Sequence, residues 1–90
     1  MMDFKSNDYV YINDSAQDDI CLLAWDYIKK TRVGQVCGIL DPKTEDPMLR
    51  QYAVKFVDMF EGGHTCRNTC PPKRGQYITA KHLQLVENYA

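Results

Sequence analysis

Ninety residues, 44% of them hydrophobic and 26% charged, can form one domain with a modest core but are too few for two. The net charge of -1 excludes a general attraction for polyanions, so a nucleic-acid function would depend on a local basic patch. No apolar run reaches the roughly 18 to 20 residues that a membrane helix needs, and the N-terminus lacks the regions of a signal peptide. We therefore expect a single cytoplasmic domain over 1–90 with reduced cysteines.

The first predicted strand covers 8–14, where aromatic and β-branched residues follow one another between turn-forming residues. Alternation along a strand places Tyr9 and Tyr11 on one face and Val10 and Ile12 on the other. We expect the aliphatic pair in the core. The two tyrosines either anchor a partner or are covered by the next element, and both interpretations stay open at this point.

A helix is predicted from about Ala16 to about Lys30, because apolar residues recur there on one helical stripe: Ile20, Leu23, Ala24, Tyr27 and Ile28. Asp14 or Ser15 can cap its N-terminus, and basic residues lie near its C-terminus, where the helix dipole favours them. Trp25 lies off the stripe and either widens the buried face or stays partly exposed.

The second predicted strand, Arg32–Leu40, is rich in β-branched and apolar residues and contains two glycines. We interpret Gly34 and Gly38 as positions where backbones come close, with no ligand required. Cys37 in this strand and Cys21 in the helix lie on apolar elements and are interpreted as core residues.

The remaining elements are shorter. A polar loop with two prolines covers 41–47, and an alternating strand follows at 51–57, with Tyr52, Val54 and Phe56 on its buried face. An irregular excursion covers 58–75. A short strand at 76–79, a helical turn at 80–82 and a last strand at 83–87 complete the order.

About five short strands in antiparallel sequence predict a mainly β fold with one helix, closed into a barrel that leaves no exposed edge. In this order the chain resembles SH3-like small barrels of the KOW and Tudor-like families, in residues 8–12, 33–39, 52–56 and 78–86. In these families a Gly-x-Val element opens the second strand, here Gly34-Gln35-Val36, and a helical turn precedes the last. The resemblance implies an SH3-like five-stranded antiparallel barrel with a helix inserted after the first strand. In style it is also similar to stand-alone accessory barrels of bacteriophage type.

The segment His64-x-Cys66-x-x-x-Cys70 has the spacing of thiolates that can bind Zn²⁺ tetrahedrally. His64 itself, with His82 or a distant cysteine, would have to complete such a site, because one cysteine pair supplies only half of it. A Cys66–Cys70 disulfide is a second interpretation. Two unpaired thiols are a third, which we favour, so no cofactor is expected.

Catalysis by Cys66 would need a base beside the thiolate, and His64 is close enough in sequence to contact it. The sequence supplies no orienting acid and no oxyanion hole, and barrels of this size rarely enclose a substrate pocket. We therefore expect a protein that is not an enzyme and has no catalytic residues.

A local basic patch with an aromatic residue predicts an alternative function, in which cations follow a phosphate backbone and a ring stacks on a base. Its members would be Arg67, Lys73, Arg74, Tyr77 and Lys81. The acidic first third of the chain opposes such binding.

Our leading hypothesis is a non-catalytic module that binds another protein, as a small accessory or inhibitor protein. The residues expected at its surface are aromatic anchors and exposed bases, which are enriched at interfaces: Tyr9, Tyr11, Trp25, Arg67 and Arg74. The alternatives are a KOW-like nucleic-acid-binding barrel and a zinc-stabilised interaction module.

Overall fold

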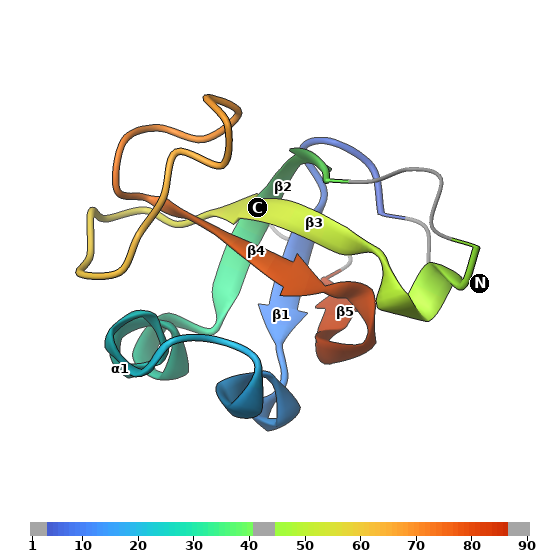
Figure 1. Cartoon of the computed structure of the whole chain (residues 1–90), viewed down its shortest axis with the longest axis horizontal. Coiled ribbons are helices and arrows are strands. Elements are labelled where there is room, and N and C mark those ends of the chain that lie inside the picture. The colour runs from blue at the N-terminus through green and yellow to red at the C-terminus, as the bar shows by residue number, and fades with distance from the viewer. Residues whose placement is uncertain (1–3, 41–44, 87–90) are drawn as a thin grey trace.

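One antiparallel sheet and one α-helix form the framework of the computed structural model, which describes residues 4–40 and 45–86 (Figure 1). The strands occur in the spatial order β4-β3-β2-β1-β5. Their bounds are β1 Tyr9–Ile12, β2 Val33–Ile39, β3 Gln51–Lys55, β4 Gly75–Thr79 and β5 Leu83–Leu85. The predicted mainly β fold with five antiparallel strands and one helix is confirmed, although β1, β2, β3 and β5 are shorter than predicted.

The sheet is open, and the predicted closed barrel is wrong for the described residues. β4 and β5 are the two edges of the sheet. They follow each other in the chain, joined by a single 3₁₀ turn, η3 (Ala80–His82). The backbone of this turn forms hydrogen bonds with Arg50 and Asn13, which lie outside the strands. The turn carries the chain from one edge of the sheet to the other without a ladder between them.

Alternation along β1 and β3 has the predicted outcome. Val10 and Ile12 are fully buried, whereas Tyr11 on the opposite face is 37% exposed. In β3, Tyr52 and Val54 are buried, and Phe56 is buried just after the strand ends. These side chains form the main core together with the helix.

The predicted helix is divided. A 3₁₀ segment, η1 (Asp14–Asp18), comes first, and the α-helix α1 begins at Leu22 and ends at Thr31. The extended backbone of Cys21, which precedes α1, breaks the helical phase between the two. Cys21 is therefore exposed instead of in the core, and of the predicted stripe Leu23 is 54% exposed.

Trp25 takes the buried position that was predicted for Leu23. It is 7% exposed and packs in the main core with Ala24 and Ile28. The predicted stripe assumed one continuous helix from Ala16, and a helix that starts at Leu22 presents a different set of residues to the sheet.

The two glycines of β2 differ in their surroundings. A Cβ on Gly34 would lie 2.4 Å from Val54 Cγ1 and 2.9 Å from the Lys55 carbonyl oxygen, so β2 and β3 approach each other as the glycine predicted. A Cβ on Gly38 would meet only Thr69 Cγ2, at 3.9 Å, so no close backbone approach requires a glycine there.

The excursion between β3 and β4 extends beyond the left ends of these two strands in Figure 1 and partly rises above them, while α1 lies below the sheet. Phe60 joins the main core, where it stacks on the Tyr27 ring with centroids 4.5 Å apart. Phe60 is therefore not an exposed aromatic. Cys66 and Cys70 pack with Ala53 in a second, smaller cluster.

The predicted polar loop, 41–47, lies partly outside the described residues, which resume at 45. A short 3₁₀ turn, η2 (Pro47–Leu49), follows there. Glu87, expected at the end of the last strand, also lies outside them. No helix in ranges 4–40 and 45–86 has the length and apolar character needed to cross a membrane.

Candidate functional site

A row of three side chains crosses the face of the sheet opposite the main core. The strand register pairs Tyr9 with Gln35 and Gln35 with Lys55, so all three side chains lie on one face of three neighbouring strands. The same row ends at Gly75 on β4. This register brings together residues from three distant parts of the chain.

These residues line a groove of about 440 Å³, which we call the β1–β3 groove. Its other lining residues are apolar or small, apart from one further base: Thr31, Val33, Gly34, Phe56, Val57 and Arg74. Tyr9, Gln35, Lys55 and Arg74 are all half-buried, as expected for polar side chains in the wall of a concave surface. Val57, at 73% exposure, presents an apolar side chain to solvent beside them.

The β1–β3 groove is positively charged. Lys55 and Arg74 both line it, and none of the nine described residues that line it is acidic. The Nε of Arg74 donates a hydrogen bond to the Phe56 carbonyl oxygen at 2.9 Å, which fixes the direction of the guanidinium group. Two cations in a groove wall, with no acidic side chain among the lining residues in ranges 4–40 and 45–86, favour an anionic ligand.

Tyr9 and Arg74 are therefore the two predicted interaction residues that the structure brings together. Sequence reasoning missed Gln35 and Lys55. Lys55 was predicted on the face of β3 opposite Tyr52, but only the pairing register places it beside Tyr9.

Tyr11 and Trp25 do not line the β1–β3 groove; the rings of both lie near the guanidinium group of Arg32. The guanidinium carbon of Arg32 is 5.8 Å from the Tyr11 ring centroid and 5.1 Å from that of Trp25. The same guanidinium forms an ion pair with Asp14 and donates to the Ile12 carbonyl oxygen at 3.1 Å. Buried Trp25 is thus part of the structure that ends α1, and its prediction as an exposed anchor is wrong.

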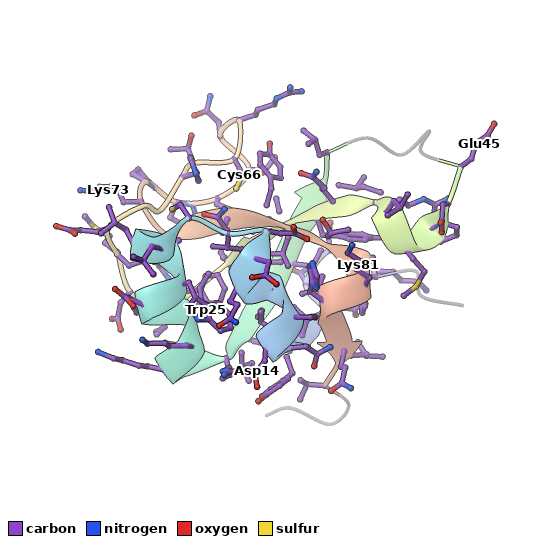
Figure 2. All side chains as sticks on the ribbon, turned by 60° about the horizontal axis from the view of Figure 1, so that its bottom comes forward. Asp14, Trp25, Glu45, Cys66, Lys73 and Lys81 are labelled. Carbon is purple, nitrogen blue, oxygen red and sulfur yellow. The ribbon has the colours of Figure 1, made fainter. Side chains whose placement is uncertain are left out.

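The predicted basic patch does not form one surface. In Figure 2 Lys73 lies at the left edge of the molecule, whereas Lys81 lies to the right of the centre. Tyr77 packs partly buried against the second cluster and lines a different pocket from Arg74. Arg67 is exposed in the excursion, within a left-handed turn.

His82 is held in place by two side chains. The Ser15 hydroxyl lies 2.7 Å from Nδ1, and an Asp19 carboxylate oxygen lies 2.5 Å from Nε2. We assign His82 the tautomer protonated at Nε2, because it then accepts from Ser15 and donates to Asp19, so that both ring nitrogens are satisfied. The hydrogen bond from His82 lowers the pKa of Asp19.

These three residues have the composition of a hydrolytic triad but not its surroundings. A polar pocket of about 270 Å³ lies beside Asp19 and His82, and Ser15 is not among the described residues that line it. Ser15 is therefore not part of the wall of this pocket. The contacts of His82 join η3 to η1 and to Asp19, the residue that follows η1.

The predicted zinc ligands do not form one site in the described residues, because His82 lies apart from the cysteines. His82 bonds to Ser15 and Asp19, whereas Cys66 and Cys70 pack against β3 on the other face of the sheet. His64 is exposed, and its backbone pairs with Gly75. Within the described residues, no group of three or more histidine, cysteine or acidic side chains is arranged to hold a metal ion.

Comparison of the chain with models of protein families, with curated proteins and with solved structures finds no match in any of the three. A function is therefore inferred from the chain itself, beginning with the β1–β3 groove.

Proposed function

We propose that the chain is a non-catalytic binding module of SH3-like type, and that its β1–β3 groove takes an extended acidic segment of another protein. The observation that carries the proposal is the row Tyr9, Gln35 and Lys55, extended by Arg74, in a groove whose described lining residues include no acidic side chain. The strand order and the 3₁₀ turn before β5 support the SH3-like assignment.

The groove contains the kinds of group that an extended peptide requires. Tyr9 and Phe56 supply ring surface, Gln35 supplies an amide that both donates and accepts, and two cations attract carboxylates. Charge of one sign within a concave wall raises the local concentration of the opposite charge and speeds its association. A small accessory protein acting in the cytoplasm is consistent with four unpaired thiols.

The proposal is tested by NMR titration of the isotope-labelled protein with a peptide of alternating glutamate and leucine. We expect chemical-shift changes concentrated at Tyr9, Gln35 and Lys55, which weaken as the salt concentration rises. A peptide of alternating lysine and leucine and a single-stranded oligothymidylate are titrated in parallel.

Two charge reversals and a matched control locate the binding. Lys55→Glu and Arg74→Glu should each weaken binding of the acidic peptide by about tenfold or more, because each replaces an attractive charge by a repulsive one. Arg67→Glu makes the same charge change in the excursion and should leave the affinity unaltered. Equal loss in all three variants, or shifts located away from the groove, would contradict the assignment. Tighter binding of the oligothymidylate would favour the nucleic-acid function.

A further inference from the structure

Three of the four thiols meet where the excursion covers the sheet. Cys37 comes from β2, and Cys66 and Cys70 come from the excursion, all packed in the second cluster with Ala53. The Cys70 thiol donates to the Cys37 sulfur, and the two sulfur atoms are 3.4 Å apart. The Cys37 thiol in turn lies 3.8 Å from the Gln35 carbonyl oxygen, an acceptor on the same strand.

The backbone before Cys70 is built so that this thiol reaches the sheet. Cys66, Arg67 and Asn68 have φ values of 49°, 56° and 69°, a run of left-handed residues that is unfavourable for non-glycine side chains. Hydrogen bonds from the Cys70 amide to the Thr65 carbonyl and from the Thr69 hydroxyl to the Cys66 carbonyl, at 2.8 Å and 2.6 Å, hold the turn closed.

The strand below the turn leaves room for the sulfur. A Cβ on Gly75 would lie 2.6 Å from both the Cβ and the Sγ of Cys70, so only glycine at this position admits the cysteine. Gly75 also exchanges both backbone hydrogen bonds with His64, at 2.7 Å and 2.8 Å, which holds the start of the turn over β4.

From this geometry we infer that Cys37 and Cys70 are a site of oxidative modification, at which a peroxide forms an intrachain disulfide that fastens the excursion to β2. Cys37 is partly exposed, whereas Cys66 and Cys70 are 3% and 5% exposed, so within the cluster the oxidant meets Cys37 first. The inference concerns the thiol cluster and does not depend on the ligand of the β1–β3 groove.

The reaction has two steps. The Cys37 thiolate attacks one oxygen of hydrogen peroxide, an S–O bond forms as the O–O bond breaks, and the released hydroxide takes a proton to become water. The Cys70 sulfur then attacks the sulfenic acid of Cys37, an S–S bond forms as the S–O bond breaks, and a second water leaves. Two thiols and one peroxide give one disulfide and two waters, and a thiol reductant reverses the change.

The rate should depend steeply on pH. Burial raises the pKa of Cys37 to about 11, and the nearby Lys55 opposes this. Burial also raises the pKa values of Cys70, to about 11, and of Cys66. Because only the thiolate attacks, the rate should rise about tenfold for each pH unit between neutral pH and about pH 10.

The test is a peptide map of the full chain after treatment with hydrogen peroxide, digested without reductant and analysed by mass spectrometry. We expect a peptide pair joined through Cys37 and Cys70, two hydrogens lighter than the separate peptides, which a thiol reductant separates again. The oxidised protein should unfold at a temperature higher by on the order of 10 °C, as expected for a disulfide that closes a loop of this length.

Variants identify the partners. Cys37→Ser should abolish the link, while Cys66→Ser and Cys21→Ser should retain it; Cys21 is the exposed control thiol. The wild-type map decides the question even if a variant at a buried cysteine does not fold. A link from Cys66 to Cys70, or intermolecular links only, would overturn the inference.

Discussion

Replacing each glycine of β2 by alanine tests which of the two is required by its surroundings. A Cβ would clash with its neighbours at Gly34 but would meet only one distant atom at Gly38. At Gly34 the new methyl group would lie 2.4 Å from Val54 Cγ1 and 2.9 Å from both the Lys55 carbonyl oxygen and Phe56 Cε1. One of these three contacts is with backbone, and the Val54 and Phe56 side chains are 0% and 1% exposed. None can move away without disturbing the core or the β2–β3 ladder.

The magnitude is set by overpacking. Forcing an extra methyl group into a well-packed core costs roughly 1 to 3 kcal/mol and sometimes more. For a domain of this size that loss lowers the unfolding midpoint by about 5 to 20 °C. Gly38→Ala should instead raise the free energy of unfolding by about 0.4 to 1 kcal/mol. Its φ lies outside the left-handed range, its nearest contact is 3.9 Å away, and alanine restricts the unfolded chain.

The assay is urea and thermal unfolding of both variants beside the wild type, followed by circular dichroism. The expected order of stability is Gly38→Ala, wild type, Gly34→Ala. Equal midpoints for the two variants would refute the argument that β2 and β3 are in contact at Gly34. Since Gly34 also lines the β1–β3 groove, the same variant should bind the glutamate–leucine peptide less tightly than Gly38→Ala.

Three further predictions concern the contacts of η1, the end of α1 and the excursion. Because the bond from His82 lowers the pKa of Asp19, the stability it adds is fully present above the ordinary value of 3.8 and is lost as the carboxyl is protonated at lower pH. Asp19→Asn should therefore reduce the slope of stability against pH in acid titrations, and an unchanged slope would contradict this. Arg32 has φ 66°, a left-handed conformation that glycine adopts more easily than alanine. Arg32→Gly and Arg32→Ala lose the same side-chain contacts, so the free energy of unfolding should be higher for Arg32→Gly by about 1 kcal/mol in urea unfolding. Phe60→Ala should cost about 3 to 5 kcal/mol in urea unfolding, whereas exposed Met59→Ala should change stability little, and similar losses would argue against a buried Phe60.

Patterns that depend on local geometry were predicted correctly. Val10 and Ile12 are buried because alternation along a strand depends only on neighbouring residues. The predicted helical phase was wrong because the backbone of Cys21 is extended, so that α1 begins at Leu22 and not near Ala16.

The candidate site depends on information that a single strand does not contain. Alternation predicts the face on which Lys55 lies, but the pairing register with Gln35 decides its neighbours, and a shift between Val36 and Gly38 changes that register along β2. Cys37 and Cys70 were predicted in unrelated roles for the same reason. Only the folding of the excursion onto the sheet brings them together.

The pairing of β1 with β5 bears on how the chain folds. Val10 pairs with Leu85 and Ile12 with Leu83, so this ladder joins the first strand to the last in the described chain. During synthesis, β1 can pair with β2 early, but its other edge stays unpaired until residues 83–85 have emerged. Contacts of such long sequence separation slow folding, and an unpaired edge of β1 is open to strands of other chains meanwhile. The step that completes the sheet is thus also the one that removes its most exposed route to aggregation.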